Sequence, residues 1–291
     1  MKEFRSSGLL SNARVYLSGP MDFVASRADE KAHGWRNRIG QFLKKFGVTV
    51  FDPWFKPEVR GLQEYGREGE TTTQQRDNWS FKPGPEGAKA RSALEQFFWP
   101  AMHIDLRMVD TSDFVIAYCP TNVYSVGTPH EIIMARSQRK PVLLVSPSVQ
   151  FPALASLKQH LANDKIGSDL LDQLSNQVPI KENPDGSPSL WYMPLIGGEN
   201  IFDGFGFAEF RKDFDWPRIR LDDEEDRHRP EKPLLPFLLQ LNDELPRKWD
   251  RVKQGYVTDD NWLLWDLVKD KLGAQVNSIN LGVAGDRKED E

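Results

Sequence analysis

Two acidic residues, Asp105 and Glu131, stand on either side of an apolar segment and have the residue type that glycosyl transfer requires. A pair of carboxylates can divide that reaction: one attacks or stabilises the anomeric carbon, and the other handles the proton of the leaving group. Spacing alone also fits a plainer interpretation, because acidic residues near helix starts are common capping and solvation choices. The elements that carry the two acids therefore have to place them together.

Glu131 lies between two predicted strands. The run Asp113–Tyr118 (DFVIAY) is nearly continuous in apolar residues, which is typical of a strand buried on both faces, and Pro141–Val145 (PVLLV) predicts another strand. Between them Thr128 and Pro129 indicate a helix start, with threonine as the N-cap. Glu131 then falls in the first helical turn, where the helix dipole keeps a carboxylate ionised and suits it to act as a nucleophile or a charge stabiliser rather than a proton donor.

The N-terminal part predicts the neighbouring strands. Residues 13–18 (ARVYLS) form a strand that ends at Gly19-Pro20, residues 28–46 form an amphipathic helix that stops at Gly47, and residues 48–51 form a second strand. Strand, helix and strand in this order favour a parallel pair. Ligands bind at the carboxyl ends of such strands, so Gly19, Pro20, the loop 120–128 and Glu131 are expected to meet there.

Asp105 lies on a predicted helix, residues 93–109, which Pro100 should kink or divide. Asp105 precedes the strand of Asp113–Tyr118 and could face the cleft expected at the carboxyl ends of the strands, where Glu131 lies. Residues 52–93 show no sustained period and predict a long insertion that serves as a lid or a subunit contact. After residue 146 we expect a helix over 153–174, a fifth strand over 190–196 (LWYMPLI), a charged linker over 218–233 and helices over 234–245 and 262–272.

Composition narrows the class of protein. The chain has 291 residues, of which 39% are hydrophobic, and a formal net charge of −5, so a globular protein without a nucleic-acid partner is expected. The single cysteine, Cys119, excludes an internal disulfide and is expected to be a buried core residue. His103 has no companion at metal-ligand spacing, so no metal site is expected. The absence of a long apolar run predicts a soluble, cytoplasmic protein without a membrane partner.

Three blocks of the first half of the chain resemble the nucleoside 2-deoxyribosyltransferase family and its relatives, the 2'-deoxynucleoside 5'-phosphate N-hydrolases. The blocks are VYLSGP at Val15–Pro20, DLRMVDTSD at Asp105–Asp113 and SVGTPHE at Ser125–Glu131. The resemblance implies an α/β, flavodoxin-like (Rossmann-type) fold with a parallel sheet of about five strands flanked by helices. It also implies a small-molecule nucleoside or nucleotide as substrate, no cofactor, and assembly as a homo-oligomer, dimer or higher.

The same resemblance implies roles for individual residues. Glu131 matches the nucleophile that attacks C1' of the deoxyribose and forms a covalent glycosyl-enzyme. Asp105 matches the carboxylate that hydrogen-bonds or protonates the departing base, and Tyr16 matches a tyrosine whose hydroxyl lies beside the nucleophile. Gly19 and Pro20 match backbone that borders the base.

Ser125 and Gly127 are predicted to bind substrate as well. Transferases of the family usually have an aspartate where this chain has Ser125, whereas the nucleotide N-hydrolases have a serine that contacts the 5'-phosphate. A serine hydroxyl can donate to phosphate without the repulsion of a carboxylate, which favours a nucleoside 5'-monophosphate. Transfer to another base, transfer to water, and a non-catalytic nucleotide-binding or sensing module on the same fold all remain open.

The domain boundaries follow from where the resemblance ends. Residues 1–200 are predicted to form the catalytic domain, with the insertion at about 52–93. Residues 201–291 are predicted to form a C-terminal extension that is partly helical and has a disordered acidic tail.

Overall fold

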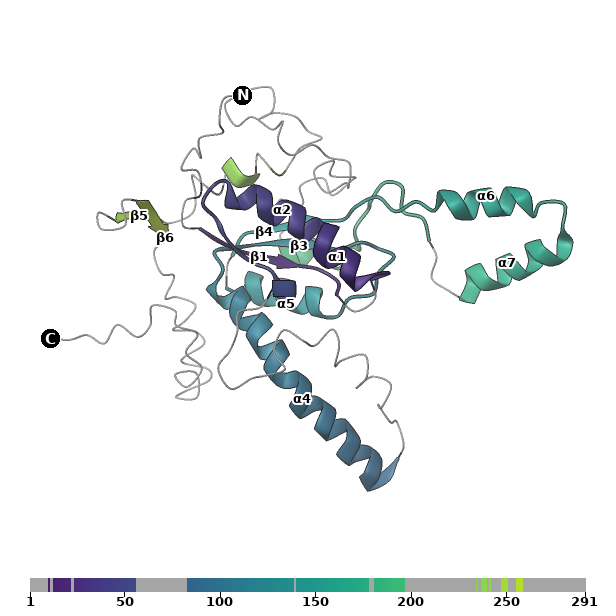
Figure 1. Cartoon of the computed structure of the whole chain (residues 1–291), viewed down its shortest axis with the longest axis horizontal. Coiled ribbons are helices and arrows are strands. Elements are labelled where there is room, and N and C mark those ends of the chain that lie inside the picture. Colours follow the sequence, from purple (N-terminus) through teal and green to yellow (C-terminus); the bar gives the residue numbers. More distant parts are fainter. Residues whose placement is uncertain are drawn as a thin grey trace.

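A four-stranded parallel sheet forms the centre of the molecule (Figure 1). The structure is a computed structural model that describes residues 10, 13–21, 24–55, 83–138, 140–177, 181–196, 234, 237–239, 241, 247–250 and 255–258. The strands are β1 (Arg14–Ser18), β2 (Thr49–Phe51), β3 (Phe114–Tyr118) and β4 (Val142–Val145). All four strands lie at predicted positions, and they confirm the α/β class.

The strand order is β2-β1-β3-β4, which is consistent with a flavodoxin-like sheet. The chain moves outward from β1 to β2 on one side and from β3 to β4 on the other, so the order reverses between β1 and β3. These two strands pair in parallel with Tyr16 opposite Val115 and Ser18 opposite Ala117. Their carboxyl ends therefore meet at the position where open α/β sheets bind ligands.

The expected fifth strand is wrong, because the sheet among the described residues has four strands and residues 190–196 contain a short helix, α8 (Tyr192–Ile196). The physical reason lies in the run LWYMPLI itself. Pro194 has no backbone N–H to donate to a strand ladder, and Leu190 and Trp191 are 80% and 84% exposed. The run instead forms a short helix whose Tyr192 and Leu195 pack against the core.

Two helices, not the single helix predicted over 28–46, connect β1 to β2. These are α1 (Arg27–His33) and α2 (Trp35–Lys44), and Gly34 separates them in an extended conformation. A Cβ at this position would lie 2.2 Å from the carbonyl oxygen of Glu30, so the break requires glycine. Gly47 has a φ of 80° and ends the connection as predicted.

Helix α2 packs on one face of the sheet. The opposite face packs against α4 (Gly84–Thr111), α5 (Gly127–Ser137) and α8. Helix α4 corrects two predictions, since it begins inside the segment assigned to the insertion and continues through Pro100 without a break. A proline removes only one helical hydrogen bond, and the long helix on both sides of Pro100 retains its own. Residues 56–82, the remainder of the insertion, lie outside the described residues.

A pair of helices, α6 (Pro152–His160) and α7 (Lys165–Gln177), projects from the body of the molecule (Figure 1). A single helix was predicted over 153–174, and the chain instead turns between the two helices. The carboxylate of Asp164 accepts hydrogen bonds from the backbone N–H groups of Ile166 and Gly167, both at 3.1 Å. Asp164 thereby starts a new helix, because it satisfies N–H groups that have no partner in a first turn.

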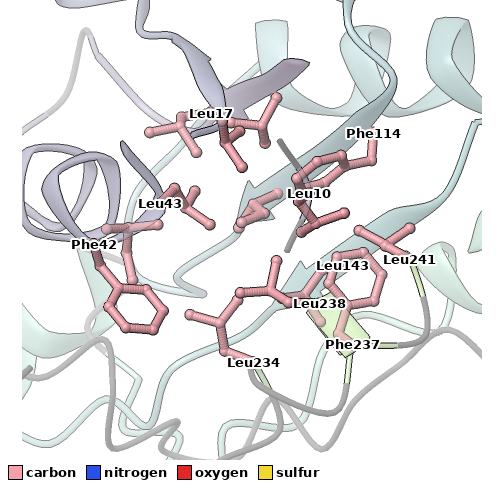
Figure 2. Close-up of a cluster of buried hydrophobic side chains, with 14 of the residues drawn as sticks. Leu10, Leu17, Phe42, Leu43, Phe114, Leu143, Leu234, Phe237, Leu238 and Leu241 are labelled. Atoms are coloured by element: carbon pink, nitrogen blue, oxygen red, sulfur yellow. The ribbon is translucent and has the colours of Figure 1, made fainter. Parts of the chain in front are cut away.

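Residues from the C-terminal part pack into the core on the α2 side of the sheet (Figure 2). Phe237 meets the ring of Phe114 edge to face with centroids 6.0 Å apart, and the described residues of the predicted helix 234–245 are helical. A hairpin of β5 (Arg247–Asp250) and β6 (Gly255–Thr258) was not predicted. The predicted linker 218–233, the helix 262–272 and the tail lie outside the described residues, and the division at residue 200 stays a prediction.

The amino-terminal edge of the sheet carries a network of charged side chains. Arg14 on β1 and Asp113 before β3 form an ion pair at 3.0 Å, and Arg107 pairs with Asp110 at 2.8 Å. The Lys140 ammonium group, 4% exposed, donates to the carbonyl oxygens of Val109, at 2.6 Å, and Asp110 at the end of α4. Burial lowers the pKa of Lys140 to about 7, against the attraction of nearby carboxylates.

Lys140 makes the free energy of unfolding depend on pH. Above about pH 7 the folded chain has lost a proton that the unfolded chain keeps up to about pH 10.5, so stability rises with pH across this window. The slope should approach ~1.4 kcal/mol per pH unit. Urea unfolding at pH 7, 8 and 9 measures it, and Lys140→Met should flatten the slope whereas Lys158→Met on the exposed helix α6 should not. Parallel curves for the three proteins would contradict this account.

Among the described residues no helix has both the length and the apolar character needed to span a bilayer.

Candidate active site

The carboxylate of Glu131 is held by two hydroxyl groups of strand β1. The Tyr16 hydroxyl donates to Oε1 at 2.7 Å, and the Ser18 hydroxyl donates to Oε2. Tyr16 is 1% exposed, Ser18 is fully buried and Glu131 is 9% exposed. Each oxygen of the carboxylate therefore has its own donor in a site that is largely screened from water.

The geometry of a strand explains why these two residues act together. Side chains two apart on a strand point to the same face, and here that face is covered by α5, which carries Glu131. Tyr16 was predicted beside Glu131, and the hydrogen bond confirms that the two meet. Ser18 was not predicted, although its i+2 position relative to Tyr16 in the run VYLS was a signal that could have identified it.

Glu131 does not lie in the first turn of its helix, as predicted, but one turn further along. Helix α5 begins at Gly127 with Val126 as its N-cap, so Thr128 is inside the helix and is not the cap. The Ser125 hydroxyl lies 2.8 Å from the Thr128 hydroxyl and accepts from the Thr128 backbone N–H at 3.4 Å. These contacts favour a helix that begins before Thr128. The groups that contact the Glu131 carboxylate are therefore the Tyr16 and Ser18 hydroxyls of β1, not the N–H groups at the start of α5.

Asp105 contributes negative charge to the same site. Burial raises the pKa of Tyr16 well above its ordinary value, and the charges of Glu131 and then Asp105 raise it further, while Arg36 opposes them. The phenol is thus protonated at neutral pH and can only donate to Glu131. Asp105 itself is half-buried near the middle of the C-terminal half of α4, and its Oδ1 atom is buried. Both predicted carboxylates are therefore close enough to Tyr16 for their charges to raise its pKa.

A buried arginine shapes the turn at the end of β1. Arg36, 1% exposed, donates to the carbonyl oxygens of Leu17, at 3.0 Å, Pro20, at 3.2 Å, and Gly19. A Cβ on Gly19 would lie 3.0 Å from both Trp35 and Arg36, so the chain passes too close for a side chain. The backbone of Gly19 and Pro20 is thus rigidly placed at the carboxyl end of β1, while its predicted contact with a base stays a prediction.

Gly127 lies beside the carboxylate, since a Cβ built on it would be 4.0 Å from Glu131 Oε1. The missing side chain leaves room next to that oxygen. Ser125, the residue expected to contact a phosphate, is half-buried and bonded to Thr128 at the start of the same helix. Its role toward a substrate stays a prediction.

Cys119 is buried at the end of β3 and is a free thiol, as predicted for a core residue. Burial raises its pKa to about 12, and a hydrogen bond with Tyr192 of α8 only partly opposes that shift. A thiol with so high a pKa carries almost no thiolate at neutral pH, so Cys119 is not suited to nucleophilic attack. Within the described part of the chain, no group of three or more His, Cys, Asp or Glu residues could hold a metal ion.

This arrangement can support attack by a carboxylate at an electrophilic carbon. Glu131 is fixed by two donors, a second carboxylate lies nearby, and the site is at the carboxyl end of the sheet where strand order reverses. No serine or cysteine activated by a base is required for this chemistry.

Comparison with known proteins shows a distant structural similarity. No family model matches the chain, and no curated protein matches it. A solved structure to which it is similar is that of a 2-deoxyribosyltransferase from the psychrotolerant bacterium Bacillus psychrosaccharolyticus, with 20% sequence identity and a TM-score of 0.26. The match covers 46% of this chain and 72% of that chain. A likeness of this degree does not establish a family, so any functional conclusion has to rest on the residues of the site.

Proposed function

We propose that this chain cleaves the N-glycosidic bond of a (deoxy)nucleoside or nucleoside 5'-monophosphate through a glycosyl-Glu131 intermediate. The observation that carries the proposal is the Glu131 carboxylate, buried at the carboxyl ends of β1 and β3 and bonded through both oxygens to β1 hydroxyls. The three sequence blocks that resemble nucleoside 2-deoxyribosyltransferases contain Tyr16, Ser18, Asp105 and Glu131. The first two donate to Glu131, and the charge of Asp105 acts on Tyr16.

In the first step an oxygen of Glu131 bonds to C1' as the bond from C1' to the base nitrogen breaks. The electron pair of the broken bond moves to the base, which takes a proton from Asp105 in its carboxylic acid form and leaves Asp105 as a carboxylate. The Tyr16 hydroxyl stays protonated, because its pKa is raised, and stabilises the carboxylate before attack. The base leaves and a glycosyl ester of Glu131 remains.

In the second step an acceptor attacks C1', gives its proton to the Asp105 carboxylate, and displaces the Glu131 carboxylate. Water as the acceptor gives the free sugar or sugar phosphate, and a second base gives a new nucleoside. Both steps invert C1', so the product keeps the original anomeric configuration. No step uses a metal ion or an organic cofactor.

Incubation with a panel of nucleosides, 2'-deoxynucleosides and their 5'-monophosphates tests the proposal, with free base measured by chromatography. Release of base from at least one substrate is expected, and faster release from a monophosphate would support the assignment of Ser125 to a phosphate. A second free base, added to the same reaction, distinguishes transfer from hydrolysis by the new nucleoside that it forms. Tight nucleotide binding with no free base after long incubation would contradict the proposal and favour a binding module.

A further inference from the structure

We infer that Ser18 is a positioning residue of the proposed reaction, which holds the Oε2 atom of Glu131 and so fixes the plane of the attacking carboxylate. This inference rests on the proposed function and extends it to a residue outside the predicted site. Ser18 is fully buried, it is the last residue of β1, and its hydroxyl donates to Glu131 across 113 residues of sequence.

A single donor would leave the carboxylate poorly defined. The last torsion of a glutamate side chain, about the bond from Cγ to Cδ, has a broad energy profile with no sharp minimum. The Tyr16 hydroxyl fixes the position of Oε1 alone, so Oε2 could still rotate about that atom. A second donor on Oε2 removes that freedom, because two fixed oxygens and the carbon between them define a plane.

The two hydroxyls come from a rigid element. Tyr16 and Ser18 both take part in the ladder between β1 and β3, where they lie opposite Val115 and Ala117. Their backbone positions are thus held by a strand in the middle of the sheet, and Arg36 holds the turn that follows. Donors on a strand are placed more exactly than donors on a loop, which is what a reacting group requires.

Space beside the carboxylate suggests how its oxygens divide their roles. Gly127 has no side chain next to Oε1, so we place the sugar carbon on the side of that oxygen. When Oε1 bonds to C1', the carboxylate becomes an ester and Oε2 becomes its carbonyl oxygen, which still accepts from Ser18. The Ser18 bond therefore persists through both steps and keeps the ester in the orientation that its breakdown needs.

The test compares Ser18→Ala with Ser112→Ala. Ser112 is a matched control, because it is 2% exposed and its hydroxyl donates to the Val109 carbonyl oxygen at 2.7 Å, on the amino-terminal side of β3. Each variant should lose a similar stability, measured by urea unfolding. Only Ser18→Ala should lower kcat, by about 10-fold to 100-fold with KM little changed.

A second variant, Ser18→Cys, protects the test against failure of Ser18→Ala to fold. The thiol fills the same space but is a weak donor, so kcat should fall between the values of the wild type and Ser18→Ala. Unchanged kcat in folded Ser18 variants, with Glu131→Gln inactive, would overturn the role of Ser18 alone. Absence of base release by the wild-type protein on every substrate would overturn the proposed function and this inference with it.

Discussion

Glu131→Gln is expected to lower kcat/KM for base release by at least about a thousandfold. An amide cannot form the glycosyl ester, and it also presents an N–H₂ group to one of the two hydroxyl donors of β1. Glutamine keeps the size of the side chain, so the loss reports the missing carboxylate rather than a cavity. Free base measured by chromatography gives the rate, and circular dichroism checks that the variant is folded.

Glu182→Gln is the matched control for this change. Glu182 is exposed and accepts a hydrogen bond from the backbone N–H of Phe151, away from the sheet, so its replacement should leave the rate unchanged. Mass spectrometry of the wild-type protein after rapid acid quenching should detect a sugar attached to Glu131, which the variant lacks. Base release that survives in folded Glu131→Gln would show that another group attacks C1' or that water attacks directly.

Asp105→Asn is expected to have an effect that depends on the leaving group. For an ordinary purine nucleoside, whose base must gain a proton as it departs, the rate should fall by about 100-fold to 10,000-fold. For a nucleoside whose purine is methylated at N7, the base already carries positive charge and leaves as a neutral molecule. The same variant should then retain most of the wild-type rate, because no proton has to be delivered.

The ratio of the two rates separates proton donation from a general loss of structure. Asp169→Asn on α7 serves as the control, since Asp169 is exposed and lies on a helix that projects from the body of the molecule. Its rates should match the wild-type rates for both substrates. Equal losses for the two substrates in Asp105→Asn would mean that Asp105 orients the substrate or supports Tyr16 without protonating the base.

The parallel sheet could be predicted from local patterns. Asp113–Tyr118 and Pro141–Val145 are runs of apolar residues short enough for buried strands, and both proved to be strands paired in parallel. Such a run carries its own signal, because a strand buried on both faces has no polar side to interrupt it. The run LWYMPLI is also apolar, but it contains a proline and begins with two exposed residues, and it did not join the sheet.

Helix boundaries were less predictable, because periodicity does not show where a helix begins or ends. Gly34 divides a continuous amphipathic pattern into two helices through a close contact with Glu30. Pro100, a strong local signal for a break, did not interrupt α4. The start of α5 lies one residue before Thr128, because the Ser125 hydroxyl takes part in the first turn. In each case contacts outside the periodic pattern decided the boundary.

The sequence by itself determined the chemical character of the site. It placed two carboxylates, Asp105 and Glu131, near the ends of predicted helices and strands. The family resemblance then gave separate roles to Glu131, Asp105 and Tyr16. The tertiary structure decided that Ser18 belongs with them and that Glu131 is held through both of its oxygens. The physical reason is distance along the chain: the bonds from Tyr16 and Ser18 to Glu131 join residues 115 and 113 positions apart, and they exist only once β1 and α5 pack together.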